Sequence, residues 1–164
     1  MPRKNRSPAK GRERARTRTA TARAKLSPVS TPANATHVLH RGGCHCRRVC
    51  FEVEAPAAIE ALDCNCSICR MTGYLHLIVP AARFRLLSGA EDLVEYTFNT
   101  GAAKHRFCRH CGIKSFYVPR SHPDGIDVNV RCLDPDTVAH LTITPFDDTQ
   151  REAQTAAIAH LSRE

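Results

Sequence analysis

The sequence has no tryptophan and few other aromatic residues, with six Phe and three Tyr among 164 residues. It has no apolar run of about 18 residues, the length that a membrane-spanning helix needs, so we expect no membrane partner. The N-terminus lacks the apolar segment of a secretory signal, so we expect a cytoplasmic protein. A domain with so few aromatic residues has a thin apolar core and needs another source of folding free energy.

Residues 1–36 carry the whole basic excess of the chain. Ten Lys/Arg and one Glu give them a net charge of +9, whereas residues 37–164 hold fourteen Lys/Arg and fifteen acids, a net −1. Residues 3–25 contain no large apolar side chain, so burial cannot offset their chain entropy and we expect a disordered tail. Three roles stay open for it: a solubilising extension, weak nucleic-acid contact through residues 3–25, or an organelle transit peptide.

Residues 37–164 have the pattern of one β-rich domain. Apolar residues recur at every second position in four runs, 49–53, 94–98, 126–130 and 141–143. This period, in short runs separated by Gly and Pro, predicts antiparallel strands. Residues 75–79 and 84–87 add two apolar strands, and only 150–161 has a weak helical stripe. The sequence therefore predicts a mainly β domain with a short C-terminal helix.

Seven of the nine cysteines fall into three clusters, Cys44-His45-Cys46, Cys64-Asn65-Cys66-Ser67-Ile68-Cys69 and Cys108-Arg109-His110-Cys111. In a cytosolic protein such pairs indicate metal ligands rather than a disulfide framework. Two pairs can close a tetrahedral Cys₄ zinc site, and the C-x-C-x-x-C trio can hold a second zinc with an open fourth position. Spacing alone does not decide which pair joins which. Core cysteines and an iron–sulfur cluster are the alternatives.

Four further residues lie in or near these clusters without being needed as ligands. Cys50 and Cys132 lie in or beside apolar strands and are expected to be buried small hydrophobes, with Cys132 the better candidate for a neighbour of a site. His45 and His110 lie inside clusters that four thiols already fill, so we expect them to face solvent or to contact a ligand from outside.

The cysteine clusters and their surroundings resemble the glutathione-dependent formaldehyde-activating enzyme family from about residue 40 to about residue 146. The resemblance rests on the motifs at 43–46, 64–69, 96–100 and 107–112, and segments 86–91 and 115–121 resemble the branch that includes centromere protein V. It implies a β-rich fold related to the zinc-binding Mss4-like proteins. It also implies two Zn²⁺ per chain: a structural one on Cys44, Cys46, Cys108 and Cys111, and a catalytic one on Cys64, Cys66 and Cys69.

The activity that this resemblance implies is the joining of glutathione to formaldehyde, a carbon–sulfur lyase reaction run in the synthetic direction. The leading hypothesis is a zinc enzyme acting on a thiol adduct of a small aldehyde, with zinc as Lewis acid. His76 and His105 are candidate general bases, and structural roles are the alternative for both. The chain departs from the family at Arg47-Arg48, where small residues are usual. A non-enzymatic, zinc-stapled interaction module with a nucleic-acid-contacting tail is the alternative function.

Overall fold

The computed structural model describes residues 36–163. The predicted tail, with its expected disorder and nucleic-acid contact, therefore lies outside the described residues except for Thr36. The described part contains ten strands and two α-helices, one of them close to the C-terminus. The prediction of a mainly β domain is confirmed. Among the described residues, no helix combines the length and apolar character needed to cross a membrane.

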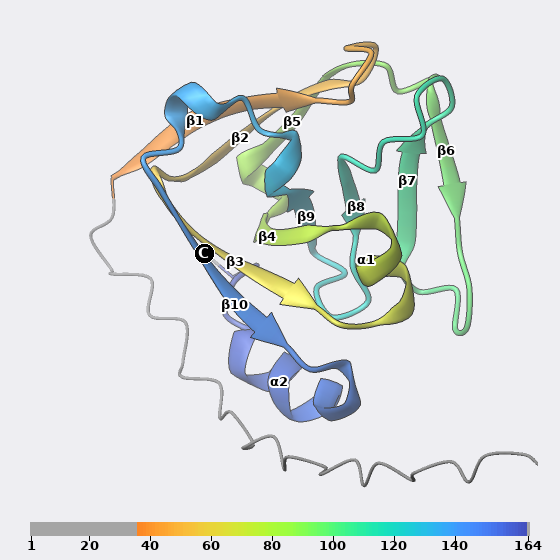
Figure 1. The fold of residues 1–164 in the computed structure, drawn as a ribbon, viewed down its shortest axis with the longest axis vertical. Coiled ribbons are helices and arrows are strands. Elements are labelled where there is room, and N and C mark those ends of the chain that lie inside the picture. Colours follow the sequence, from red (N-terminus) through yellow and green to blue (C-terminus); the bar gives the residue numbers. More distant parts are fainter. Residues whose placement is uncertain (1–35, 164) are drawn as a thin grey trace, which may run out of the picture.

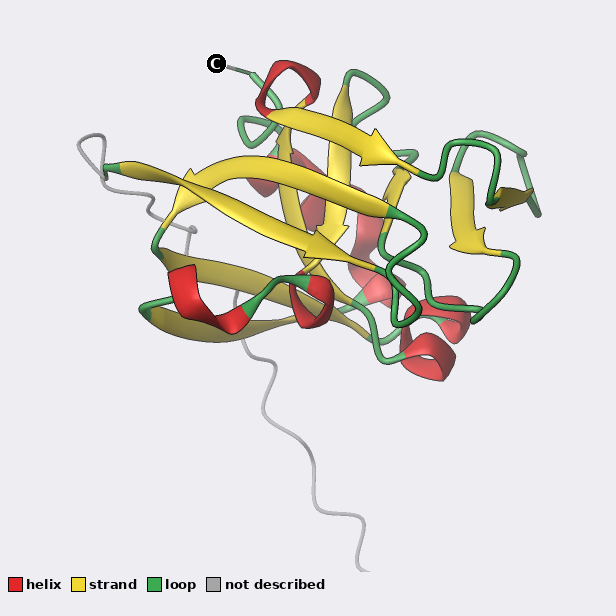
Figure 2. Cartoon of the chain, turned by 90° about the horizontal axis from the view of Figure 1, so that it is seen from above, coloured by secondary structure: helices red, strands yellow, loops and turns green. Residues whose placement is uncertain are grey.

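The strands form two sheets, and the smaller lies over the larger (Figures 1 and 2). The three-stranded sheet has the order β1 (His37–Gly43), β2 (Cys50–Pro56), β5 (Phe84–Ser88). The seven-stranded sheet has the order β10 (His140–Phe146), β3 (Ala58–Cys64), β4 (Leu75–Pro80), β9 (Gly125–Asn129), β8 (Phe116–Val118), β7 (Lys104–Cys108), β6 (Leu93–Tyr96).

Helices occupy the connections and the C-terminal end. The α-helices are α1 (Ser67–Thr72) and α2 (Arg151–Ile158). Four short 3₁₀ turns are η1 (Ala81–Arg83), η2 (Val130–Cys132), η3 (Pro135–Thr137) and η4 (Asp148–Gln150). The predicted strand at 94–98 ends at Tyr96, and Val130 belongs to η2 rather than to β9.

One strand pair differs from the antiparallel arrangement expected from the sequence. β10 runs parallel to β3, from the pair His140↔Ala58 to the pair Phe146↔Cys64, whereas the other strand pairs are antiparallel. A period of two tells which face a side chain occupies and carries no information on strand direction. The parallel pair brings the end of β10 to Cys64.

The main core fills the space between the two sheets. Phe51 of β2 stacks on Phe84 of β5 at 5.5 Å between ring centroids and meets Phe116 of β8 edge-on at 5.9 Å. On the opposite face of the large sheet, Ile158 of α2 packs against Leu62 and Ile78. β4 is therefore covered on both faces, which explains why it is buried along its whole length and reads as a continuous apolar run.

Candidate functional site

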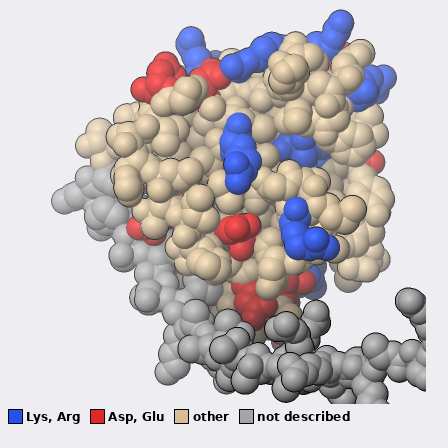
Figure 3. Space-filling model, in the orientation of Figure 1, with Lys and Arg blue, Asp and Glu red and all other residues tan. Residues whose placement is uncertain are grey.

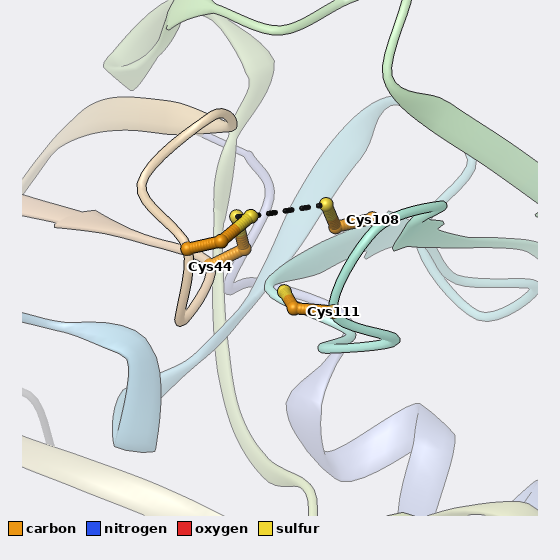
Figure 4. A group of neighbouring side chains, drawn as sticks. Cys44, Cys108 and Cys111 are labelled. Atoms are coloured by element: carbon orange, nitrogen blue, oxygen red, sulfur yellow. Dashed lines mark hydrogen bonds between the residues drawn. The ribbon is translucent and has the colours of Figure 1, made fainter.

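Four thiols from two loops meet at one end of the core (Figure 4). Cys44 and Cys46 lie between β1 and β2, while Cys108 ends β7 and Cys111 follows it. The Sγ atoms of Cys44 and Cys46 are 3.5 Å apart, and those of Cys46 and Cys108 are 3.7 Å apart. Tetrahedral zinc with Zn–S bonds of about 2.3 Å sets its ligands about 3.8 Å apart. The donor set and spacing of this group, which we call the four-thiol group, fit such an ion.

Two glycines let these loops fold back on their cysteines. A Cβ at Gly43 would lie 2.5 Å from the carbonyl oxygen of Val49, so only glycine allows this approach. Val49 then donates its backbone N–H to Cys44 Sγ at 3.4 Å. Gly112 has φ 74° and donates its N–H to the carbonyl of Cys108 at 2.8 Å, closing the second turn.

The pKa values of Cys44 and Cys111 are shifted in opposite directions. Burial raises the pKa of Cys44 to about 12, against the opposing effect of the Val49 amide. Burial also opposes ionisation of Cys111, but the backbone amides of Ile113 and Cys46 and the neighbouring thiols together lower its pKa to about 6. Because metals bind the thiolate form, the buried Cys44 thiol depends more than the Cys111 thiol on a cation for its ionisation.

The predicted trio Cys64, Cys66 and Cys69 gathers where β3 leads into α1. Cys64 belongs to two groups whose ligand atoms lie within 4.8 Å of one another: Cys64, Cys69 and His76, and Cys64, Cys66 and Asp148. Cys64 therefore lies at metal-binding distance from Cys69 in one group and from Cys66 in the other. We call Cys64, Cys66 and Cys69 together the three-thiol cluster. The sequence marks His76 as a candidate general base, with a structural role as the alternative, and gives no local signal for Asp148.

The three thiols shift the pKa values of one another in opposite directions. The thiols of Cys64 and Cys69 lower the pKa of Cys66. The interaction with Cys66, together with burial, raises the pKa of Cys64 to about 11, against the opposing effect of Cys69. The pKa of Cys69 is raised by its hydrogen bonds to both neighbours and by burial. Two thiols thus support one thiolate, the form in which sulfur binds a metal.

His76 is held by a carboxylate at the back of this cluster. Its Nδ1 lies 2.7 Å from Oδ2 of Asp127, and both side chains are almost completely buried. His76 Nε2 and Asp127 Oδ1 have no hydrogen-bond partner among the described residues. Tyr74 donates its hydroxyl proton to the backbone oxygen of Asp127 at 2.6 Å, which fixes this part of β9.

A cavity of about 150 Å³ opens beside the three-thiol cluster. Its wall includes a row of stacked rings, in which His105 lies 5.3 Å from Phe98 and 4.9 Å from Tyr117, centroid to centroid. The other lining residues are Leu62, Cys64, Cys66, Ile68, Cys69, His76, Ile78, Asn99, Thr100, Ala103, Pro119, Arg120, Ser121, Asp127, Phe146, Asp148, Arg151, Thr155 and Ile158. Residues of the four-thiol group are absent from this lining.

His105 is in the cavity wall with both ring nitrogens buried and without hydrogen-bond partners in residues 36–163. Burial, followed by the positive charge of Lys114, lowers the pKa of His105 to about 4. The imidazole is therefore neutral near pH 7, and one of its nitrogens can accept a hydrogen bond or a proton from a ligand.

Sequence reasoning missed Lys114, a buried cation behind the cavity wall. Its Nζ lies 4.0 Å and 4.4 Å from the ring centroids of Tyr117 and Tyr74 and has no hydrogen-bond partner within the described part of the chain. Burial lowers the pKa of Lys114, while the thiols of the three-thiol cluster and Asp127 oppose that effect. No local motif around Lys114 distinguishes it from a surface lysine.

The remaining candidate residues near the cysteine clusters in the sequence do not line the cavity. Arg47 pairs with Asp134, and neither Arg47 nor Arg48 lines the cavity, so these arginines do not meet a ligand there.

Cys50 is half-buried, with its thiol directed at the carbonyl of Arg47. Cys132 is half-buried against the core beside the four-thiol group. His45 and His110 are exposed, as expected.

Charges of both signs are interspersed over the face drawn in Figure 3. This fits the nearly neutral charge balance of residues 37–164 and gives no sign of a basic stripe on that face.

Comparison with known proteins agrees with the cysteine geometry. The model of the glutathione-dependent formaldehyde-activating enzyme family matches residues 39–147, which is more than half of the chain. The chain belongs to this family, which suggests glutathione-dependent formaldehyde activation. A crystal structure of a Rhodobacter sphaeroides protein is similar at 38% sequence identity and a TM-score of 0.55, covering 63% of this chain and 99% of that one. The resemblance inferred from the motifs is confirmed.

Proposed function

We propose that this protein is a zinc-dependent carbon–sulfur lyase of the S-hydroxymethylglutathione synthase type. In this proposal Cys44, Cys46, Cys108 and Cys111 hold a structural zinc, and the three-thiol cluster holds a catalytic one. The observation that carries it is an asymmetry: the three-thiol cluster lines the cavity, whereas the four-thiol group does not. A metal held by the cluster is therefore the one that a ligand in the cavity can reach.

The cavity suits the reacting end of a thiol and a small aldehyde. Its volume of about 150 Å³ is about ten times the roughly 10–15 Å³ that a cavity needs to hold one water. Formaldehyde and a cysteinyl side chain fit such a space, and the rest of a tripeptide thiol must lie across the rim. Arg120 and Arg151 line the cavity and can meet a carboxylate of a thiol such as glutathione.

The reaction needs little beyond orientation, a proton carrier and polarisation. A thiolate sulfur adds to the carbonyl carbon, a C–S bond forms, and the carbonyl electron pair moves to oxygen, which takes a proton. Bound zinc would supply Lewis acidity and favour thiolate over thiol. Neutral His105 can hydrogen-bond to the thiol and then to the new alkoxide, which orients both, while the thiol proton passes to solvent and the alkoxide takes a proton from solvent. Loss of the aldehyde runs these steps in reverse.

The proposal includes a reducing compartment such as the cytoplasm, because the thiols must stay reduced to bind metal.

Magnetisation-exchange NMR on mixtures of glutathione and formaldehyde tests this function. The zinc-loaded protein should speed exchange between free glutathione and its S-hydroxymethyl adduct above the rate in buffer. Cys66→Ser should abolish the acceleration, whereas Cys50→Ser, outside the clusters, should retain it. Absence of any acceleration by protein with two bound zinc ions would reject this function and favour a non-enzymatic module.

A further inference from the structure

We infer that His76 is the fourth protein ligand of the metal held by the three-thiol cluster in the resting protein, and that an incoming thiol takes its place. The inference rests on the proposed function, and it changes the expected Cys₃ site with an open position into a closed Cys₃His site that opens on substrate binding.

The position of the imidazole supports coordination. A ring nitrogen of His76 lies within 4.8 Å of the Sγ atoms of Cys64 and Cys69. Nδ1 is hydrogen-bonded to Oδ2 of Asp127 at 2.7 Å, so Nε2 is the nitrogen that can bind a metal. Nε2 is buried and has no hydrogen-bond partner among residues 36–163. A buried, unpaired ring nitrogen is costly unless a ligand or ion meets it, and a cation shared with the thiols would do so.

Asp127 makes His76 resemble the histidines of known zinc sites. Metal-binding histidines commonly donate their second N–H to a carboxylate, which fixes the tautomer and strengthens the ligand. Asp127 is 1% exposed and reaches His76 from the neighbouring strand β9. Asp127 is thus a positioning residue for the ligand nitrogen.

Asp148 is the competing fourth ligand, because its carboxylate groups with Cys64 and Cys66. Its oxygens, however, already accept hydrogen bonds from Arg151, with Nε at 2.6 Å from Oδ1. Asp148 is also more exposed than His76. Coordination by Asp148 would break its ion pair with Arg151, whereas coordination by His76 uses a nitrogen that is free.

Displacement follows from the position of His76 at the cavity. His76 lines the same cavity as the three thiols, so a thiol that enters would meet the imidazole and the sulfurs that would hold the metal. Exchanging a neutral imidazole for a thiolate leaves the three anchoring sulfurs in place. The imidazole then remains attached to Asp127, ready to rebind when the product leaves.

NMR of the full-length protein loaded with ¹¹³Cd²⁺ and labelled with ¹⁵N at histidine tests the inference without relying on turnover. The wild type should bind two Cd²⁺ and show scalar coupling between one cadmium and Nε2 of one histidine. The coupling should vanish in His76→Gln and persist in His105→Phe, which alters the other histidine in the cavity. Asp127→Asn should retain the coupling but lower cadmium affinity by about 10–100-fold. Saturating glutathione should remove the coupling.

Absence of histidine coupling in wild-type protein with two bound Cd²⁺, or coupling that survives in His76→Gln, would overturn the inference. Coupling that persists with bound glutathione would overturn the displacement step. Because the first measurement is made on the wild type, poor folding of a variant cannot hide the result. Coupling present without acceleration of the glutathione reaction would support the ligand and count against the proposed function alone.

Discussion

Replacing one cysteine in each group with serine should separate a structural metal site from a functional one. Cys111→Ser removes a ligand that joins two distant loops, since Cys46 and Cys108 are 62 residues apart in the chain. Cys66→Ser removes a ligand from a cluster whose three thiols lie within one short segment, 64–69. The chemical change is the same in both variants, so a difference in stability reflects how far apart in the sequence the joined ligands lie.

The chain-entropy argument gives the size of the difference. Closing a loop of 62 residues rather than one of five restricts the unfolded chain more, by about 2 kcal/mol on a (3/2)RT ln n scale. Structural zinc contributes roughly 10–16 kcal/mol to folding, so one of four equal ligands accounts for about 2.5–4 kcal/mol. A typical domain has about 5–15 kcal/mol in total. Cys111→Ser should therefore leave the domain close to unfolding.

Urea denaturation of the zinc-loaded proteins, followed by circular dichroism and combined with metal analysis, measures this effect. Cys111→Ser should lower the free energy of unfolding by at least about 2 kcal/mol more than Cys66→Ser. Cys66→Ser should keep the fold and one zinc, and Cys50→Ser serves as the control for loss of a thiol outside the groups. Equal destabilisation by Cys66→Ser and Cys111→Ser would mean that the two sites are reversed or wrongly paired.

Three further predictions concern the cavity wall and the tail. Burial lowers the pKa of His105 to about 4, so the neutral imidazole stabilises the fold fully above pH 6.5. As the pH falls toward 4, this contribution is lost, and the free energy of unfolding falls by at most about 3 kcal/mol. His105→Phe should show a smaller loss of unfolding free energy between pH 7 and pH 4.5 than the wild type, and an identical loss would contradict this. Lys114→Met should lower zinc affinity at the three-thiol cluster roughly tenfold without destabilising the metal-free fold. Competition with a chelating dye measures the affinity, and an unchanged value would exclude an electrostatic role for Lys114. Deleting residues 1–36 should leave zinc content and unfolding free energy unchanged and abolish any salt-sensitive nucleic-acid binding, whereas equal binding by the truncated domain would point to a surface of the fold.

The parts of the fold that the sequence predicted are those with strong local patterns. β2 alternates because one face meets the core, and β4 is a continuous apolar run because both its faces are covered. β7 (Lys104–Cys108) has no such alternation, since its side chains are mostly half-buried. α1 is only six residues long and carries Cys69, so a periodic stripe cannot develop. The parallel direction of β10 depends on its partner β3, which the local pattern does not contain.

The candidate site likewise contains residues that a local pattern predicts and residues that only the folded structure brings together. The seven cysteines could be predicted because each cluster holds its ligands within a few positions of one another. His76, Asp127 and Lys114 meet only through the pairing of β4 with β9 and the packing around Tyr117. One local signal was available: His76 interrupts a strand that is apolar throughout, and a polar side chain buried on both sides needs a partner. That pattern indicates that His76 has a buried partner, but it does not identify Asp127 as that partner.

Charge balance explains why a buried ammonium lies behind this cavity. Zn²⁺ on three thiolates carries a net charge of −1, and replacing a neutral imidazole with a substrate thiolate would make it −2. Such a charge is costly in a site with little water unless a cation lies nearby. Lys114 interacts electrostatically with all three thiols and with Asp127, yet it forms no hydrogen bond in the described part of the chain. In the proposed ligand exchange, the positive charge of Lys114 would offset the charge of the added thiolate, and the excess negative charge would favour ligand exchange over the generation of hydroxide.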